Sequence, residues 1–413
     1  MFGVKENWRT INQVKDFRNY LLIFWLVVFG LNLNAAIFFL YPLSLGLNFA
    51  EMMFVYFSLS RIVYLIMIVP TGVIADRYSV KFCISFTILA FAVAYFTRGF
   101  LPFIMVPLFA FVVSEIIMGI ADSSLIGASD KYQYSFSKRI SDIHIFSIND
   151  SVTFFTRAIA ALTGGLIVHL SSMRWTQIIG GLIISIGFIL SLKFIKEPKY
   201  NKQRENFLNI YKRGFKYVIN HKKTLYLIMG LSLFGLGVFA SRNVFQPLLS
   251  DLGLNIDKFA VAFGLIFSLQ MIFSGIGSYV IQKISKKIRL SLLIFLTLIL
   301  MSLFLFSLTR FELIIPVVLL IWLIAFAEGS QQTQATIILN RFIKSENIRA
   351  TINSISALVS SLVLVLLMPV IGYFTDKFGI NANLYISSLL VLSGAIVLYI
   401  PHLKNKSNLR FKH

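Results

Sequence analysis

The sequence predicts an all-α integral membrane protein with twelve transmembrane helices in two pseudo-symmetric six-helix bundles. Three observations carry this prediction: the composition, the number of apolar runs, and a repeat of half the chain. Of the 413 residues, 57% are hydrophobic and only 13% are charged, whereas about a quarter of the residues of a soluble chain are charged. A hydrocarbon layer of ~30 Å takes about 20 apolar residues per crossing, so this length leaves room for twelve crossings.

Apolar runs alternate with short polar breaks along the chain. In the first half they lie at 20–43, 51–73, 81–97, 101–127, 143–169 and 173–195. In the second half they lie at 225–249, 259–282, 290–309, 313–338, 350–374 and 382–401. The first run exceeds the apolar core of a signal peptide, so we expect it to remain as a span. We therefore predict an N-terminal bundle (1–195), a cytoplasmic basic linker (196–224) and a C-terminal bundle (225–413).

The two halves share short motifs in the same order. Phe29-Gly30-Leu31 recurs as Phe234-Gly235-Leu236, and Leu45-Gly46-Leu47-Asn48 recurs as Leu252-Gly253-Leu254-Asn255. The offsets of 205 and 207 residues place the first span on the seventh. A repeat of this kind is typical of membrane proteins built from two related bundles around a central site.

Positive charge is concentrated in alternate connections between the runs. With the N-terminus inside, 30 of the 38 Lys and Arg residues fall in cytoplasmic segments. Five fall in outer connections: Arg98, Arg174, Lys258, Arg310 and Lys377. This bias predicts that both termini are cytoplasmic, and it explains the net charge of +21 without a nucleic-acid partner. We expect the basic linker to lie on the anionic inner leaflet of the bilayer or to bind a partner protein.

The connection after the second run carries the most specific motif, Pro70-Thr71-Gly72-Val73-Ile74-Ala75-Asp76-Arg77-Tyr78-Ser79-Val80-Lys81. It resembles the G-x-x-x-D-R-x-G-R-K loop of the major facilitator superfamily. Four positions match the motif: Gly72, Asp76, Arg77 and Lys81. Ser79 and Val80 depart from it. The segment 339–354 resembles the N-R-x-I-P-S-E-x-R-A-T-x-x-S run of a prokaryotic twelve-helix subgroup that includes drug exporters.

The resemblance implies secondary transport by alternating access, with the 70–81 loop as part of a conformational gate. We expect Asp76 to engage the start of the eleventh span near Arg349, because the N-terminus of a helix is electropositive. Arg77 is expected to engage Asp130 at the end of the fourth span. The gate residues predicted in this way are Gly72, Asp76, Arg77, Lys81, Asp130 and Arg349.

Span five departs from the pattern of drug/proton antiporters. Those relatives carry G-P-x-x-G-G, whereas this chain has Ala160-Ala161-Leu162-Thr163-Gly164-Gly165. The glycine pair is present and the Gly-Pro is absent, so this stretch gives little support to antiport. Thr156, Ala160 and Gly164 instead form a ridge of small residues, which predicts close helix packing in lipid.

Seven charged residues lie inside the apolar runs and away from their ends: Arg61, Glu115, Asp122, Asp150, Arg157, Arg242 and Glu328. Because a charge in hydrocarbon costs at least ~2.5 to 3.5 kcal/mol, each is expected to be paired or to face a polar cavity. Counting residues from the inner ends of spans four and five places Glu115 and Arg157 at similar depth, which predicts a pair. Asp122 shares the helix face of Glu115. Glu115 and Asp122 are therefore candidates to carry a coupled proton, and a purely structural Glu115–Arg157 bridge is the alternative.

Two further arginines lie inside the spans: Arg61 near mid-depth in span two, and Arg242 toward the outer half of span seven. They favour a carboxylate-bearing substrate, because guanidinium binds oxyanions with two hydrogen bonds. Alternatively, each neutralises an acid, either Glu328 or an acid of span four. Asn32 and Asn34 in span one add amides to the spans that line the cavity in the family.

The five histidines show no ligand-like spacing, and there is no G-x-x-x-x-G-K-[ST] run, so no metal, cofactor or direct use of ATP is expected. We predict a monomeric transporter rather than an enzyme, located in a bacterial cytoplasmic membrane. Its predicted activity is proton-coupled export of a small amphipathic or drug-like molecule. The alternatives are import of a nutrient or metabolite, lipid flipping, uniport, and a receptor or scaffold that does not transport.

Overall fold

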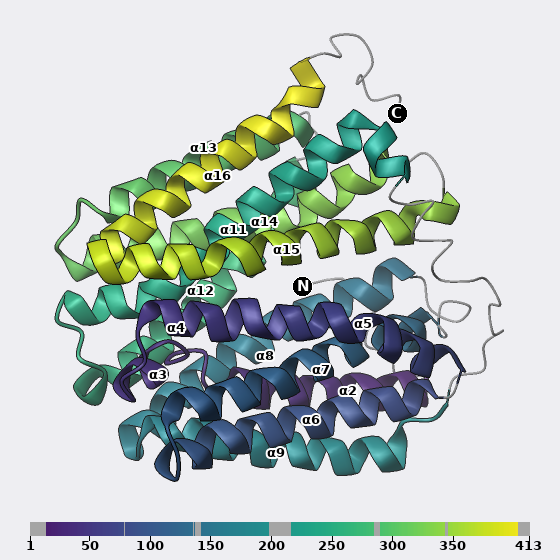
Figure 1. Cartoon of the computed structure of the whole chain (residues 1–413), viewed down its shortest axis with the longest axis horizontal. Helices are drawn as coiled ribbons and strands as arrows, with labels where there is room; N and C mark the ends of the chain where they lie inside the picture. Colours follow the sequence, from purple (N-terminus) through teal and green to yellow (C-terminus); the bar gives the residue numbers. More distant parts are fainter. Residues whose placement is uncertain are drawn as a thin grey trace. The chain divides into compact units, whose positions relative to one another are not determined.

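The computed structural model describes residues 14–77, 79–134, 136, 142–197, 216–284, 290–342 and 346–403. All the regular structure in these ranges is helical. The chain forms two compact units (Figure 1): the first holds Met1–Gln203 with Asn255–Met271, and the second holds Arg204–Leu254 with Ile272–His413. Most of the predicted basic linker lies outside the described residues.

The first unit contains α2 (Lys15–Asn32), α3 (Leu40–Ser44), α4 (Phe49–Met53), the π-helix η1 (Phe54–Leu59), α5 (Ser60–Arg77), α6 (Val80–Phe100), the 3-10 helix η2 (Leu101–Phe103), α7 (Pro107–Tyr134), α8 (Asp142–Leu170) and α9 (Met173–Phe194). The second part of the chain contains α11 (Lys222–Asp251), α12 (Ile256–Ile284), α13 (Leu290–Leu308), α14 (Ile314–Phe342), α15 (Glu346–Phe378) and α16 (Ile380–Leu403). The beginning of α12 belongs to the first unit and its remainder to the second.

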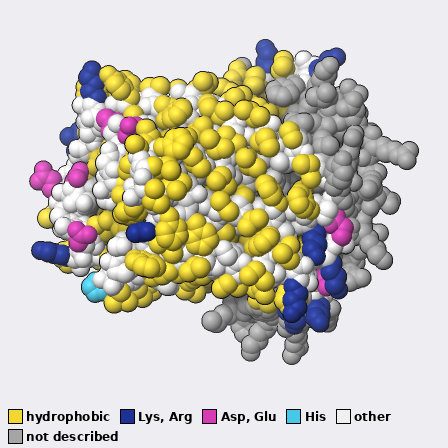
Figure 2. All heavy atoms as spheres, turned by 60° about the horizontal axis from the view of Figure 1, so that its bottom comes forward, with side chains coloured by type: hydrophobic (Ala, Val, Ile, Leu, Met, Phe, Trp, Pro, Cys, Tyr) yellow, Lys and Arg dark blue, Asp and Glu magenta, His cyan; other side chains and the backbone are white. Residues whose placement is uncertain are grey.

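Eleven helices among the described residues are long and apolar enough to cross a membrane, and they match the second to twelfth predicted spans. Figure 2 shows the corresponding surface: hydrophobic side chains cover the middle of the face, and most charged side chains lie toward its two ends. Such a continuous apolar surface is stable in lipid and would aggregate in water. The predicted all-α membrane fold is confirmed.

The first predicted span, 20–43, is broken in two. Its helix α2 ends at Asn32, residues 33–39 form turns, and α3 completes the run. The Asn32 side chain donates a hydrogen bond to the Val28 carbonyl oxygen at 2.7 Å, and Leu33 N bonds to Gly30 O in the tighter i to i+3 pattern. An amide side chain that binds its own helix backbone in this way weakens helix continuation.

Helices of the first unit pack closely where glycine removes the side chain. Helix α6 packs against α7 and α9, and α5 packs against α7, as Figure 1 shows. A Cβ atom on Gly119 of α7 would lie 2.6 Å from Ser60 O at the start of α5, and a Cβ on Gly164 of α8 would overlap the carbonyl oxygen of Leu33. These two contacts hold α5 against α7 and the broken first span against α8.

The contact at Gly164 yields a test. Gly164→Ala should lower the midpoint of thermal unfolding in detergent, by the equivalent of about 1–3 kcal/mol, because the methyl group must displace backbone. Gly235→Ala is the matched control, since a Cβ there meets nothing within 4 Å. Equal thermal midpoints for the two variants would show that α8 does not depend on this close approach.

Candidate functional site

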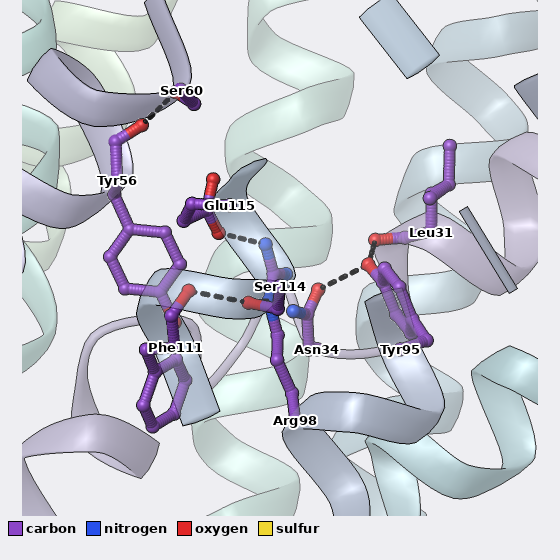
Figure 3. A network of polar contacts seen from close by, with 9 residues as sticks. All are labelled: Leu31, Asn34, Tyr56, Ser60, Tyr95, Arg98, Phe111, Ser114 and Glu115. Atoms are coloured by element: carbon purple, nitrogen blue, oxygen red, sulfur yellow. Dashed lines mark hydrogen bonds and ion pairs between the residues drawn. The ribbon is translucent and has the colours of Figure 1, made fainter. Parts of the chain in front are cut away.

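A buried ion pair joins two helices of the first unit. Arg98 in the last turn of α6 and Glu115 on α7 are only 2% and 3% exposed, and Arg98 Nη2 contacts Glu115 Oε1. Arg98 Nε also donates a hydrogen bond to Ser114 Oγ at 3.0 Å (Figure 3). The guanidinium therefore has polar partners on two of its sides, which a charge buried in a membrane requires.

Two tyrosine rings complete the environment of the guanidinium. Its central carbon lies 5.3 Å from the ring centre of Tyr56 and 5.6 Å from that of Tyr95, so both are within range of a cation–π attraction. Tyr56 belongs to the π-helix η1, and Ser60 Oγ donates to the Tyr56 carbonyl oxygen at 2.6 Å. The π-helix of the second span thus places the Tyr56 ring beside the Arg98 guanidinium. Such π-helical turns are frequent at functional sites.

The network extends from Arg98 to the broken first span. Tyr95 donates a hydrogen bond to Leu31 O, and its hydroxyl lies 3.3 Å from Asn34 Oδ1. Tyr41 of α3 donates to the Arg98 carbonyl oxygen at 2.9 Å. Of the two predicted asparagines, Asn34 is buried in this network, whereas Asn32 bonds to its own helix.

The structure corrects two predictions about these charges. Arg98 was expected in an outer loop, but α6 continues to Phe100 and buries it. The residue paired with Glu115 is therefore Arg98, while the predicted partner Arg157 lies exposed on α8. Equal depth in two helices does not bring side chains together, because the rotation of each helix also has to match.

The sequence contains a signal that would have found this pair. Between Lys81 and Asp122, the only charged residues are Arg98 and Glu115. An arginine at the end of one apolar run and a glutamate inside the next favour each other as partners, because no other charge is near in the hairpin. The rings of Tyr56 and Tyr95 carry no comparable signal.

Asp122 and Arg61 lie beside the ion pair. Asp122 is half-buried on α7, seven residues after Glu115 and hence on the same face. The charges of Arg61 and Arg98 both act on Asp122, and the Arg61 guanidinium carbon lies 5.6 Å from the Tyr64 ring centre. Among the described residues, Asp122 makes no hydrogen bond or ion pair. Asp122 is therefore an acid near two arginines, with no ion pair to either of them.

A second ion pair lies in the second unit. Arg242 Nε on α11 is 3.1 Å from Glu328 Oε2 on α14, with the arginine side chain 31% exposed and the glutamate side chain 4% exposed. This is the pairing that the sequence offered as the alternative to anion binding by Arg242. The neighbouring Asn243 is buried, and its amide nitrogen has no hydrogen-bond partner among the described residues.

The predicted gate is described only in part. Gly72, Asp76 and Arg77 lie in α5, Asp130 in α7 and Arg349 in α15, but their side chains, like that of Asp150 in α8, lie outside the described part of the chain. Lys81 Nζ donates to the Leu192 carbonyl oxygen at 2.8 Å. This bond satisfies a carbonyl in the last turn of α9, where a cation is favoured.

Glu197 is a further residue of this end that the sequence did not single out. Its carboxylate accepts hydrogen bonds from Ser79 Oγ at 2.6 Å, Val80 N at 2.8 Å and Lys81 N at 3.0 Å. An acid placed at the first turn of α6 satisfies backbone donors that have no partner within the helix. The chain just after α9 is thereby tied to the start of α6.

These features define a polytopic α-helical membrane protein with a buried ion pair in its first unit and a partly exposed one in its second. Residues 20–344 match the family model described as Major Facilitator Superfamily. The chain belongs to this superfamily and is a membrane transporter rather than an enzyme. Among the residues described, no cluster of His, Cys, Asp or Glu could hold a metal ion.

Known relatives agree with this assignment. The chain is 23% identical over 355 residues to the uncharacterized MFS-type transporter YxaM of Bacillus subtilis (strain 168). This alignment covers 84% of this chain and 86% of the relative. The structure of the nucleoside transporter NupG matches with a TM-score of 0.72 at 14% identity, over 96% of this chain and 100% of the other. An inward-facing, occupied bacterial homolog of the human lysosomal transporter Spinster matches with a TM-score of 0.75 at 12% identity, over 95% of this chain and 98% of the other. At such identities, the two structural likenesses describe the fold.

The Arg98–Glu115 pair yields a double-mutant test. Glu115→Gln leaves a buried guanidinium without its counter-charge and should destabilise the protein by about 3–5 kcal/mol, measured as a lower unfolding midpoint in detergent. Replacing both partners with apolar residues, Arg98→Met with Glu115→Leu, should recover most of that loss. A double variant as unstable as the sum of its single variants would mean that the two charges do not act as a pair.

Proposed function

We propose that this transporter is a proton-coupled exporter of a small amphipathic or drug-like molecule, and that Asp122 carries the coupled proton. The observation that supports Asp122 is its environment: it is half-buried, under the charges of Arg61 and Arg98, and without a hydrogen bond or ion pair to any described residue. A coupling acid must exchange its proton as its surroundings change. A carboxylate without a fixed partner does this at the lowest cost.

Glu115 is the weaker candidate of the two acids predicted for this role. Its carboxylate is in direct contact with Arg98, which is itself held by Ser114 and two rings. Protonation of Glu115 would leave a buried cation uncompensated, which costs several kcal/mol. Glu115 therefore fits the structural role, and it fixes Arg98 at a position from which the arginine acts on Asp122.

Substrate binding is proposed for the polar groups of α11. Arg242 uses Nε toward Glu328 and remains partly exposed, and the Asn243 amide nitrogen is a buried donor with no partner among the described residues. Buried donors without partners favour a ligand that brings oxygen acceptors. A molecule with an apolar body and a carboxylate or similar group fits these donors, and its oxygen atoms would compete with Glu328 for Arg242.

The remaining predicted features form part of the same proposal. Alternating access would involve the gate residues Gly72, Asp76, Arg77, Lys81, Asp130 and Arg349, in a monomer with cytoplasmic termini in a bacterial inner membrane. Two bundles, 1–195 and 225–413, would move about the linker 196–224. Protonation of Asp122 would change the balance of charge around Arg61 and so favour one conformation over the other.

Import of a polar metabolite is the second candidate. The fold likeness to a nucleoside transporter and the amide of Asn243 favour it, since hydrogen bonds to amides are common in the recognition of neutral polar ligands. The orientation of membrane vesicles distinguishes export from import. Everted membrane vesicles with a proton gradient accumulate the substrate of an exporter, whereas right-side-out vesicles accumulate the substrate of a proton-driven importer.

The role of Asp122 can be tested without knowing the substrate. Spin labels at Ile104→Cys and Leu313→Cys, in a Cys83→Ser background, report the distance between the two connections that we predict to be external. In the parent protein, this distance distribution should shift between mildly acidic and mildly alkaline pH. Asp122→Asn, which mimics the protonated acid, should hold the distribution seen at acidic pH at every pH, because the titrating charge is gone.

Asp257→Asn is the matched control, since Asp257 is an exposed acid in the first turn of α12, and it should leave the pH response intact. A full pH response in Asp122→Asn would remove Asp122 from the coupling mechanism. Loss of the response in both variants would mean that general surface charge, rather than one acid, sets the conformational balance.

A further inference from the structure

The second unit has an apolar groove that the transport mechanism does not use. It encloses about 550 Å³ between α11, α15 and α16. Leu236 of α11 and Ile371 of α15 form its buried floor. Its walls come from α15 and α16, with Phe374, Phe378 and Tyr385 among them. The tyrosine hydroxyl is the one side-chain polar group in this lining.

The groove is open along α15. Val370 is 47% exposed and Phe378 is 58% exposed, although both line it. Protein side chains therefore do not fill the space. Because the groove lies in a span that runs from Ile355 to Phe378, an apolar molecule from the bilayer can enter it from the side.

The length of the groove corresponds to one leaflet. Its lining on α15 runs from Leu367 to Phe378, the last residue of the helix. The eleven steps from Leu367 to Phe378, at about 1.5 Å per residue, give roughly 16 Å. Half of a hydrocarbon core of ~30 Å is roughly 15 Å. The groove thus extends from near mid-membrane to the end of the span, as an extended acyl chain does.

Two cations lie at the open end. Lys377 Nζ is 5.4 Å from the ring centre of Phe378, which lines the groove. The Arg310 guanidinium carbon is 5.4 Å from the ring centre of Phe306, and that ring is 5.6 Å from Tyr385 of the lining. Both cations are exposed, and neither forms an ion pair with a carboxylate that the structure describes.

Helix geometry places the acid next to Lys377 on a side of α15 that does not line the groove. Lys377 follows Phe374 by three residues and precedes Phe378, so it borders the face that lines the groove. Asp376 is two residues from each of these aromatic residues and lies on the opposite side of α15. Glu312 follows Arg310 by two residues and is also exposed. The two cations are the charged groups placed against the aromatic rings at this end of the groove, and this arrangement complements the phosphate of an anionic lipid.

We propose that this groove binds one acyl chain of an anionic phospholipid, with the lipid phosphate held by Lys377 and Arg310. Association of apolar surfaces inside a bilayer gains little from the hydrophobic effect, because the bulk lipid is equally apolar. Selectivity must therefore come from the head group. A single Lys or Arg near a charged lipid surface changes binding on the order of five-fold.

The test uses the full chain in detergent and measures retained lipid by native mass spectrometry after addition of phosphatidylglycerol or phosphatidylcholine with identical acyl chains. The parent protein should retain phosphatidylglycerol preferentially. Lys377→Gln should reduce that preference about five-fold, and Lys258→Gln, which changes an exposed cation that is not part of the groove lining, should not. Equal retention of the two lipids by the parent protein would overturn the proposal.

A variant that fills the groove distinguishes lipid bound in the groove from lipid bound elsewhere on the lipid-facing surface. Val370→Trp occupies the groove and should abolish preferential retention, whereas Leu389→Trp, on an exposed position of α16 outside the lining, should not. If Val370→Trp does not fold, phosphatidylglycerol with a photoreactive acyl chain provides the second measurement in the parent protein. Its cross-links should map to α15 and α16 between residues 367 and 390, and cross-links spread evenly over other helices would also reject the site.

Discussion

The first unit is organised around the buried Arg98–Glu115 ion pair. Placing either charge in hydrocarbon alone costs at least ~2.5 to 3.5 kcal/mol, so the fold is stable only if the two meet and their remaining polar atoms are satisfied. Ser114, Tyr56 and Tyr95 surround the guanidinium. These groups come from α6, α7 and η1, and the hydroxyl of Tyr95 ties the first span to them. The requirement of one arginine therefore constrains four segments of the bundle.

This constraint gives a reason for the irregular backbone in the first two spans. A membrane tolerates turns and π-helices only where protein groups satisfy the exposed peptide bonds. Around the turns at 33–39, Tyr95 binds Leu31 O, and Gly164 allows α8 to cover Leu33. At η1, the hydroxyl of Ser60 satisfies the Tyr56 carbonyl. Both breaks lie beside the ion pair, so the cost of each is offset where the network can supply hydrogen bonds.

Features that depend on composition and local pattern were predictable from the sequence. The apolar runs predicted the second to twelfth spans because a bilayer selects for length and hydropathy, whatever the neighbours of each helix. Partners across helices were not predictable in the same way. Arg98 was assigned to a loop because hydropathy does not distinguish a terminal helical turn from the loop that follows it. The position of Tyr56 depends on the π-helix η1, and the residues 54–59 contain no pattern that predicts a π-helix. The pairing of Arg242 with Glu328 was among the predicted alternatives, since both stood in runs with few other charges.

The short sequence separation of the central pair also bears on how the protein is made. Arg98 and Glu115 are only 17 residues apart, so at a synthesis rate of about 5–20 residues per second the acid follows the arginine out of the ribosome within roughly 1–4 s. An arginine that waited for a partner from a distant part of the chain would stay exposed to lipid or to the insertion machinery for much longer. Because α6 and α7 are consecutive, a hairpin of these two helices can enter the bilayer with its opposite charges already paired. The ion pair thus couples the stability of the finished bundle to the order in which its helices are inserted.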